Sequence, residues 1–489
     1  MAYIGKTPVI GNFVKLDSIT VVNGQAAYTM QNGGVNFTSY DNVNQFLVSL
    51  NGVLQAPTDS FTVSGSTLTF ASNLSTGDVI DFVLVLGNSL DIGTPSDNTV
   101  TAAKIASDAV TTAKIADSNI TSAKIASGVI QNQSAFKNII INGDMSIAQR
   151  GTSTSSITGN GYHTMDRYHL NCDTMGTWTQ SQSTEVPTGQ GFAYSMKMDC
   201  TTADASPAAG DQLKIQIKNE GQFLQYLKKG TSSAESLTLS FWVRSNKTGT
   251  YITRLQDTDN SRNISKSYTI SSADTWEKKE ITFAGDTTGA FTNDANNSLV
   301  VDFYLGAGSN FTSGTLNTSW NSITNANTAV GQVNLADSTS NEWYITGVQL
   351  EAGTSASDFE FLPHDVTKRR CYRYYYRLNF GGGLKYVGFG QVDNDNQNIP
   401  AICNVFPEQM RTAPTALEQS GTASDYKVRE AGTYNCTSVP TFNNASTWNA
   451  TVTFKRQDIT SSDGFAQGEL LKCGGTAGHL GWSAELWQF

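Results

Sequence analysis

Two pairs of acidic residues have the chemistry that a glycosidase needs. Asp257 lies two residues before Asp259, and Asp393 lies two residues before Asp395. Cleavage of a glycosidic bond uses two carboxyl groups about 5–9.5 Å apart, one as proton donor and the other as nucleophile or base. Such a pair is assembled by the fold and leaves no local motif. These four residues therefore keep a polysaccharide-degrading enzyme among the hypotheses without identifying one.

Metal-binding and nucleophile patterns are weaker. The run Asp393–Asn396 places oxygen ligands at alternate positions, as a Ca²⁺ loop does, but Asn398 stands where such a loop has glycine. His163 and His169 flank Asp166 at a six-residue spacing that fits no common zinc motif. The sequence contains no GxSxG, HExxH or phosphate-binding loop. We interpret the run as a polar turn and the histidines as structural, and we expect no catalytic residue, metal or cofactor.

The composition is that of a β-rich chain with many turns. Only 15% of the 489 residues are charged, against about 25% in an average protein, and 43 are glycine. The net charge of −10 argues against a general electrostatic attraction to nucleic acid. No run of 18 apolar residues and no signal-peptide pattern occurs, so we expect no membrane insertion. The six cysteines form no CxxC pair, and we expect reduced structural thiols.

Residues 1–92 are predicted to form a small β-domain. The strand-like segment Gln45–Leu54 contains Asn51-Gly52, a hairpin signal, and Phe61–Phe70 alternates around a turn at Gly65-Ser66. Val79–Leu86 is apolar on both faces. Both faces must then be covered, by the domain itself or by another subunit.

Residues 93–133 contain the tetrapeptide AKIA three times with a period of ten. Large aliphatic residues recur every five positions, a spacing that fits neither one helical stripe nor one face of a strand. A repeat segment of this length has no core of its own. We therefore predict a stalk whose aliphatic residues pack against copies from other chains, with a flexible linker as the alternative. The expected packing residues are Val100, Ile105, Val110, Ile115, Ile120, Ile125 and Ile130.

Residues 134–366 are predicted to form a jelly roll or two-sheet sandwich. Apolar residues alternate along Leu237–Val243, Tyr251–Leu255 and Leu299–Leu305, and spacers rich in Asn, Ser, Thr and Gly separate these runs. Residues 367–489 are predicted to form a β-rich C-terminal unit. The fold class predicted for the whole chain is therefore all-β.

In the C-terminal unit, Tyr372, Tyr374 and Tyr376 alternate with other residues as on one face of a strand. Exposed aromatic rings, together with Asn, Asp and Arg side chains, would suit recognition of sugars. Packing in the core or between subunits is the alternative for the tyrosines. The candidate receptor-binding residues are Tyr374, Tyr376, Asp393, Asn394 and Trp448.

Five short motifs follow one another along the chain: Lys137–Asp144, Gln149–Gly151, Asp166–Tyr168, Gly347–Glu351 and Met410–Thr415. They occur in the order found in bacteriophage tail fibre and tail-associated proteins, which this chain resembles over nearly its whole length. One departure is Tyr168, where the pattern usually has tryptophan. The AKIA repeats resemble those in fibres of short-tailed phages of marine bacteria, including cyanophages, and residues 1–90 resemble the fibre domain that anchors to the tail.

The resemblance implies an elongated, modular homotrimer in the virion, made in the host cytoplasm. Residues 1–92 would bind the adaptor or nozzle proteins of the tail, and the C-terminal half would bind a host surface polysaccharide or outer-membrane receptor. Within the motifs we expect Asp144 and Asp166-Arg167 to form a structural salt bridge or turn. We expect a structural protein that is not an enzyme. A tail-spike depolymerase and a secreted bacterial carbohydrate-binding protein remain the alternatives.

Overall fold

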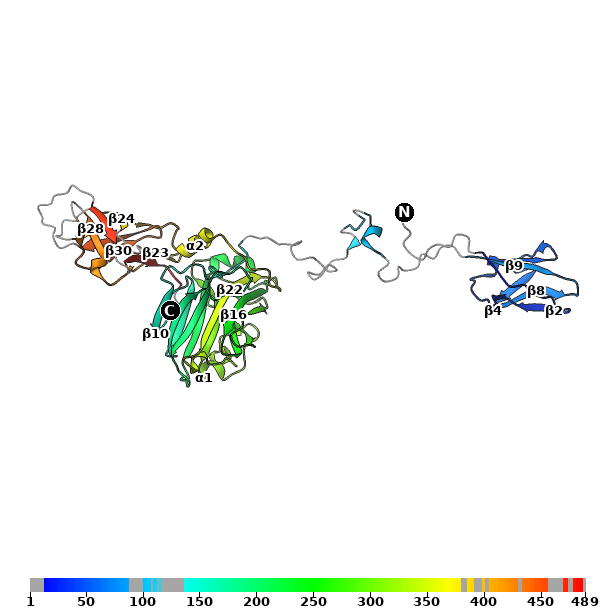
Figure 1. The fold of residues 1–489 in the computed structure, drawn as a ribbon, viewed down its shortest axis with the longest axis horizontal. Coiled ribbons are helices and arrows are strands. Elements are labelled where there is room, and N and C mark those ends of the chain that lie inside the picture. Colours follow the sequence, from blue (N-terminus) through cyan, green and yellow to red (C-terminus); the bar gives the residue numbers. More distant parts are fainter. Residues whose placement is uncertain are drawn as a thin grey trace. The chain divides into compact units, whose positions relative to one another are not determined.

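The structure is a computed structural model whose strands greatly outnumber its helices (Figure 1). The chain divides into two compact units, residues 1–132 and 133–489. The all-β prediction is confirmed. In the described part of the chain, no helix has the length and apolar character needed to cross a membrane. The structure describes residues 13–87, 100–106, 109–111, 114–115, 136–379, 385–390, 398–400, 404–429, 433–455, 469–473 and 478–486.

The first unit contains two antiparallel sheets around one core. One sheet has the order β1-β9-β5-β6 and the other β2-β8-β7, and a small ribbon pairs β3 with β4. Phe46, Val48, Phe61, Leu68 and Val83 are among the buried residues that both sheets contribute. The strand bounds are Phe13–Lys15 (β1), Gln25–Thr29 (β2), Gln31–Asn32 (β3), Val35–Asn36 (β4), Phe46–Leu50 (β5), Val53–Leu54 (β6), Phe61–Ser64 (β7), Thr67–Leu74 (β8) and Ile80–Leu86 (β9).

Both predicted hairpins of this unit are confirmed. Asn51 and Gly52 join β5 to β6 with φ values of 55° and 80°, the left-handed pair that a tight type I′ hairpin turn requires. Gly65, with φ 55°, lies in the turn between β7 and β8. These turns depend on two adjacent residues, which explains why the local sequence predicts them.

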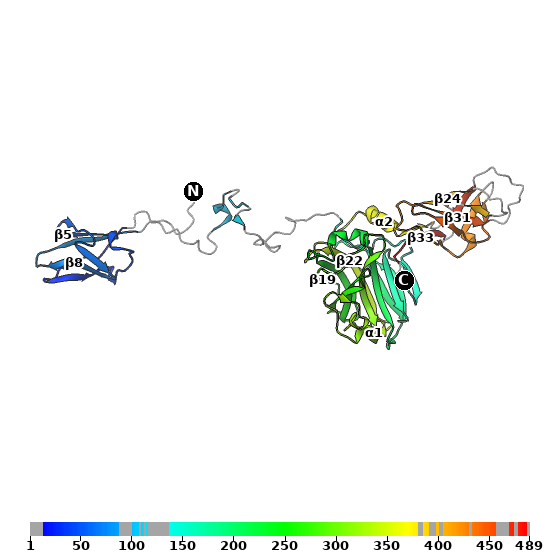
Figure 2. The ribbon, with the colours of Figure 1, turned by 180° about the vertical axis from the view of Figure 1, so that it is seen from behind.

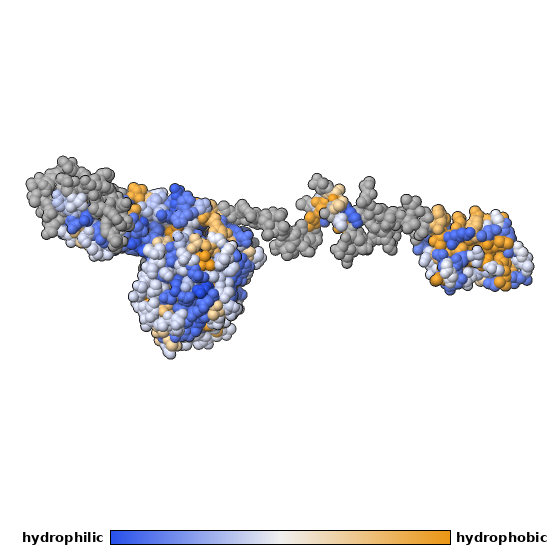
Figure 3. All heavy atoms as spheres, viewed as in Figure 1, coloured by the Kyte–Doolittle hydropathy of each residue, from blue (hydrophilic) through white to orange (hydrophobic). Residues whose placement is uncertain are grey.

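Strand β9 has one face in the core and one face that its own unit leaves partly uncovered. Val83 and Val85 are buried, whereas Phe82, Leu84 and Leu86 are half-buried. On the neighbouring strands, Phe13 lies opposite Leu86 and Leu47 opposite Leu84, and both are exposed. Figure 3 shows apolar side chains spread over much of the visible face of this unit. We predicted that the domain itself or another subunit covers this outer face of β9. Within the described residues, the domain itself leaves the face partly open.

The repeat segment is described at only a few positions. Ala102–Lys104 form a 3-10 turn, and Val100, Ile105 and Val110 are 43–55% exposed. Ile115 is half-buried. Ile120, Ile125 and Ile130 lie outside the described residues. The packing of these aliphatic residues against other chains stays a prediction.

A two-sheet sandwich forms the first part of the second unit (Figures 1 and 2). Its six-stranded sheet has the order β10-β13-β14-β22-β16-β19, and its seven-stranded sheet has the order β11-β12-β15-β20-β17-β18-β21. The core between them includes Trp178 and Trp343, both fully buried. The bounds in the first sheet are Ser153–Ile157 (β10), Thr177–Ser183 (β13), Ser195–Thr202 (β14), Leu237–Ser245 (β16), Glu277–Phe283 (β19) and Glu342–Ala352 (β22). Those in the second are Gly161–Tyr162 (β11), Tyr168–Asp173 (β12), Gln212–Glu220 (β15), Gly249–Asp257 (β17), Arg262–Ile270 (β18), Asn297–Ala307 (β20) and Asn321–Ser322 (β21). A short helix, α1, covers Ser309–Thr312.

The second part of this unit consists of small antiparallel sheets. Their orders are β23-β33-β27, β24-β32-β28-β29 and β25-β31-β26, with β30 also paired to β31. Phe406, Met410, Tyr426, Phe454 and Trp482 are buried together in its core. The bounds are Tyr375–Asn379 (β23), Lys385–Gly390 (β24), Asn398–Pro400 (β25), Asn404–Val405 (β26), Glu418–Gln419 (β27), Tyr426–Arg429 (β28), Thr433–Asn435 (β29), Thr441–Ala445 (β30), Asn449–Lys455 (β31), Glu469–Cys473 (β32) and His479–Ser483 (β33).

The strand predicted from Tyr372 onward is wrong in its first half. Residues His364–Tyr372 form helix α2, and the chain becomes extended only at β23. Thr367 and Cys371, four residues apart and therefore on one face of the helix, are buried. Asp365 in the first turn and two arginines in the last turn favour the helix dipole. This charge pattern was the local signal for a helix, and the tyrosine alternation obscured it.

Candidate functional site

Two of the sequence motifs meet in the sandwich. The amide of Val348 in β22 donates to the carbonyl of Gly143 at 2.9 Å. A Cβ atom on Gly143 would lie 2.1 Å from the carbonyl oxygen of Val348, so only glycine fits there. The side chain of Asn138 donates to the Val348 carbonyl at 3.1 Å and accepts from the amide of Leu350 at 3.1 Å. The Asn-Gly motif therefore fixes the backbone of β22.

Three further motifs meet where the sandwich contacts the small C-terminal sheets. The backbone amide of Gln149 donates to Asp166 at 3.0 Å, and its side chain donates to the carbonyl of Tyr375 at 2.8 Å. Burial raises the pKa of Asp166 to about 6. We call this buried contact the seam. It comprises Gln149, Arg150, Asp166, Arg167, Glu220, Arg373, Tyr374, Tyr375, Arg411 and Glu485.

The centre of the seam is the carboxylate of Glu485, which is 1% exposed. Arg167 forms an ion pair with one oxygen, and the guanidinium of Arg150 lies 3.6 Å from the other. Arg167 thus makes a structural salt bridge, as expected, but its partner Glu485 lies outside the motifs. Asp144 instead accepts a hydrogen bond from the hydroxyl of Ser146 at 3.0 Å. Arg373 adds a bidentate pair with Glu220 at 2.7 and 2.8 Å. Removing one partner from a buried ion pair of this kind leaves an uncompensated charge and strongly destabilises the fold.

The two tyrosines of the seam cover the arginines. The guanidinium of Arg167 lies 3.4 Å from the ring centroid of Tyr374, and that of Arg150 lies 3.5 Å from the ring centroid of Tyr375. Tyr374 is only 1% exposed. Its assignment as a receptor contact is therefore corrected, because a ring stacked on a buried arginine has no free face for a sugar.

Lys218 lies next to the seam and forms no ion pair within the described residues, although its ammonium lies 6.0 Å from the ring centroid of Tyr162. Its side chain is fully buried, its carbonyl accepts from Arg167, and its ammonium has no hydrogen-bond partner among the described residues. Burial lowers the pKa of Lys218 from 10.5 to about 8. The charged form therefore destabilises the folded state at neutral pH.

Replacing Lys218 with methionine is expected to stabilise the protein by about 1–3 kcal/mol at pH 7, because the variant buries no charge. Because the folded-state pKa lies below the unfolded one, the native chain gains stability as the pH rises from 8 to about 10.5. The difference in unfolding free energy between the Lys218→Met variant and the unaltered chain should therefore decrease over that pH range. Urea unfolding followed by tryptophan fluorescence measures it, with Lys278→Met on the exposed Lys278–Glu280 pair as control. A destabilised Lys218→Met variant would contradict the assignment.

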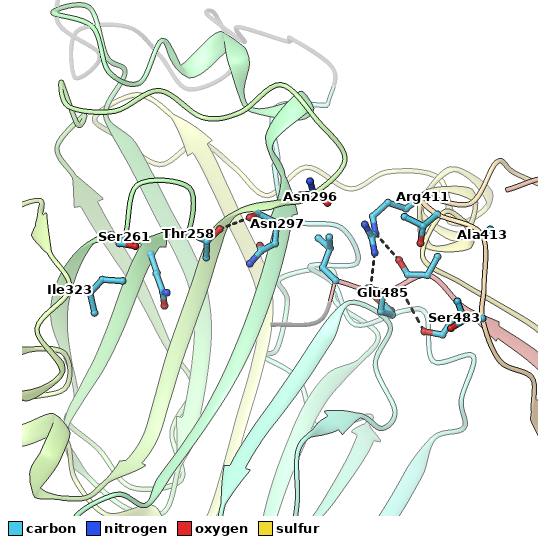
Figure 4. A pocket seen from close by; sticks show the side chains of 14 residues that line it. Thr258, Ser261, Asn296, Asn297, Ile323, Arg411, Ala413, Ser483 and Glu485 are labelled. Atoms are coloured by element: carbon cyan, nitrogen blue, oxygen red, sulfur yellow. Dashed lines mark hydrogen bonds between the residues drawn. The ribbon is translucent and has the colours of Figure 1, made fainter. Parts of the chain in front are cut away.

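A polar groove of about 620 Å³ runs beside the seam between the sandwich and the C-terminal sheets (Figure 4). One wall comes from the end of β17 and the loop after it, the residues at the start of β20, and Ile323 just after β21. The other wall comes from the Met410–Thr415 motif, the end of β33 and the residues that follow β33. Arg411 holds the two walls together by donating to the carbonyls of Ala295 at 3.1 Å and Ala484 at 2.8 Å. The lining residues are Gln256, Thr258, Ser261, Asn296, Asn297, Ile323, Arg411, Thr412, Ala413, Thr415, Ser483, Ala484, Glu485 and Leu486.

The groove offers neutral hydrogen-bonding groups. Amides and hydroxyls dominate its lining, and the side-chain oxygen of Asn297 is buried with no hydrogen-bond partner in the part of the chain that the structure describes. Glu485 is the one acidic residue among the lining residues, and Arg167 and Arg150 already hold its carboxylate. The described lining therefore contains no second carboxylate with which Glu485 could act as a glycosidase pair.

The remaining candidate contact residues do not come together in one place. Tyr376 stacks on Trp482 at a centroid distance of 6.0 Å and packs against the C-terminal core. Trp448 is 53% exposed, and it is absent from the lining of the groove. Asp393 and Asn394 lie outside the described residues.

The residues considered for chemistry have structural contacts. Asp257 is buried in an ion pair with Lys229 at 2.5 Å, and Asp259 accepts from the amide of Thr292 at 2.8 Å. Burial lowers the pKa of His169 to about 3, so this ring is neutral. Cys172, Cys200, Cys371 and Cys436 are buried free thiols, as predicted. Within the described ranges, no three His, Cys, Asp or Glu residues gather as metal ligands would. Asp395 and the side chains of Cys403 and Cys473 lie outside them.

Comparison with known protein families finds no match, and neither does comparison with curated proteins. Among solved structures, the enzymatically active domain of tailspike protein 4 from bacteriophage CBA120 matches 44% of this chain with 14% identity and a TM-score of 0.24. The match covers 21% of that domain. A putative sugar binding protein from Bacteroides thetaiotaomicron matches 44% of this chain and 99% of its own, with 11% identity and a TM-score of 0.25.

The family 11 carbohydrate-binding module from Clostridium thermocellum, solved with a β-1,3-1,4-linked tetrasaccharide, matches 42% of this chain and 98% of its own. Its identity is 10% and its TM-score is 0.22. The solved structures that this chain is similar to thus include carbohydrate-binding modules, a phage tailspike domain, a xylanase that carries a carbohydrate-binding module and an exo-β-agarase, all at low TM-scores. Function is argued below from this chain's own residues.

Proposed function

We propose that this chain is a homotrimeric tail fibre protein of a bacteriophage that binds a host-surface glycan in the polar groove and does not cleave it. The observation that carries the glycan assignment is the groove itself. Side-chain amides and hydroxyls on one wall, and hydroxyls with Arg411 on the other, match the alternating donors and acceptors of sugar hydroxyl groups.

Binding without cleavage follows from the state of Glu485. A glycosidase acid must reach the scissile oxygen, whereas both oxygens of Glu485 face arginines. Each groove would bind its glycan weakly, and three copies per fibre would raise the avidity.

Incubating the full chain with an array of bacterial surface polysaccharides tests this proposal. We expect retention on at least one polysaccharide, with no release of new reducing ends. Retention with release of reducing ends would overturn the non-enzymatic part of the proposal. Failure to bind any polysaccharide from a strain that the phage infects would overturn the glycan part.

Trimer formation is supported by apolar surface that the described residues of one chain leave uncovered. It occurs on the outer face of β9 and its neighbours, around Phe13 and Leu47, and at Val100, Ile105 and Val110 of the repeat. The first unit would then attach the trimer to adaptor or nozzle proteins of the tail.

Light scattering on the full chain should give three times the chain mass of 52.6 kDa. Replacing Ile105, Ile115 and Ile125 together with serine should lower the thermal stability of the trimer, since each fully buried isoleucine contributes about 1.5–3 kcal/mol. A monomeric mass for the unaltered chain would contradict the packing of the repeat against copies from other chains. An unaltered melting temperature for the serine variant would show that the repeat is a flexible linker.

A further inference from the structure

A second cavity, of about 410 Å³, differs from the groove in its chemistry. Three exposed aromatic rings line it: Phe136 is 57%, Phe223 52% and Tyr226 48% exposed. It shares no lining residue with the groove. We call it the aromatic pocket. Its volume falls in the range of about 300–1,000 Å³ that small-molecule sites occupy.

Two arginines line this pocket: Arg370 in helix α2 and Arg373 directly after it. They differ in whether a carboxylate pairs with them. Arg373 is neutralised by its bidentate pair with Glu220. Arg370 lies with its guanidinium 5.9 Å from the ring centroid of Phe136. No carboxylate forms an ion pair with Arg370 among the described residues.

The acidic residue that acts on Arg370 through space is already bound elsewhere. The carboxylate of Glu360 accepts from the backbone amides of Phe136, Lys137 and Asn138. Burial lowers the pKa of Arg370, so its environment disfavours a charge that no partner compensates. The pocket thus combines apolar ring faces with one cation that has no ion-pair partner in the described ranges.

We propose that the aromatic pocket is a second sugar site, specific for an acidic sugar of the hexuronate class. The apolar face of the sugar ring would stack on Phe223 or Tyr226. Its carboxylate would make a paired hydrogen bond to the guanidinium of Arg370. A neutral sugar would leave that cation unpaired, so the pocket discriminates by charge, as the groove does not.

The probe is trigalacturonate, with maltotriose as the neutral counterpart, and binding to the full chain is measured by calorimetry at low salt. Trigalacturonate should bind, and Arg370→Gln should weaken its binding about tenfold or more through loss of the charged pair. The matched control is Arg369→Gln on the same helix, which is 69% exposed and should leave the affinity unaltered. Phe223→Ala, at an exposed position, should weaken binding without unfolding the chain.

Three results would overturn the inference: equal binding of both trisaccharides, equal effects of the two arginine variants, or no binding of trigalacturonate. A second copy of the chain could also cover the pocket. In that case Phe223→Ala would lower the oligomer mass seen by light scattering and leave trigalacturonate binding unaltered, which also overturns the inference. The groove is tested apart from this site. Ala413→Trp in the groove should leave trigalacturonate binding intact, so failure at one site is distinguishable from failure at the other.

Discussion

Replacing Glu485 with glutamine is expected to destabilise the second unit by about 3–5 kcal/mol, the cost of breaking a buried ion pair from one side. The substitution preserves the size of the side chain and removes its charge. Arg167, which is 2% exposed, would then have no ion-pair partner among the described residues, and Arg150 would keep only Glu418, 4.0 Å away. Water cannot replace the lost carboxylate at this depth without opening the contact between the sandwich and the C-terminal sheets.

Urea unfolding followed by tryptophan fluorescence measures this loss of stability, because the buried Trp482 lies three residues before Glu485 in the same segment. The control is Glu280→Gln, whose pair with Lys278 is 50% exposed on the glutamate side. An exposed pair of this kind contributes at most about 1 kcal/mol. Similar midpoints for the two variants would show that the seam does not hold the two parts of the unit together.

Filling the groove with a tryptophan at Ala413 is expected to weaken glycan binding by about a hundredfold or more, by steric exclusion of the ligand. Ala413 is an exposed lining residue, so a larger side chain enters the groove instead of the core. The fold should therefore survive the substitution. A binding isotherm with the polysaccharide found by the array gives the affinity.

Ala416→Trp is the matched control for this variant. Ala416 is exposed three residues further along the same loop and is not among the lining residues. The control should bind the glycan as the unaltered chain does. If both variants bind normally, the glycan site lies elsewhere on the chain, and exposed Trp448 becomes the first position to test.

Local signals predicted much of the fold. The hairpin at Asn51-Gly52 needs two residues, and strands such as β16 and β20 show their apolar alternation within one short run. Helix α2 was missed because tyrosine alternation outweighed its buried pair, Thr367 and Cys371.

The seam and the groove could not be derived from local patterns. Arg167 pairs with Glu485, which lies 318 residues away in the sequence, and the sequence around either residue does not indicate this partner. The sequence motifs Gln149–Gly151, Asp166–Tyr168 and Met410–Thr415 were visible, but their meeting place was not. Arg411 shows why: its three backbone acceptors come from Ala295, Ala484 and Glu485, in two distant segments. Sites of this kind are built by long-range packing, which periodicity does not report.

Hydrogen exchange of the full chain with and without its glycan tests the central claim, recognition in the polar groove, most directly. The result expected is slower exchange on both walls, in residues 256–261 and 411–415, with Ala413→Trp abolishing the effect. Slower exchange confined to the loop around Trp448, or the same protection in the Ala413→Trp variant, would contradict recognition in the groove.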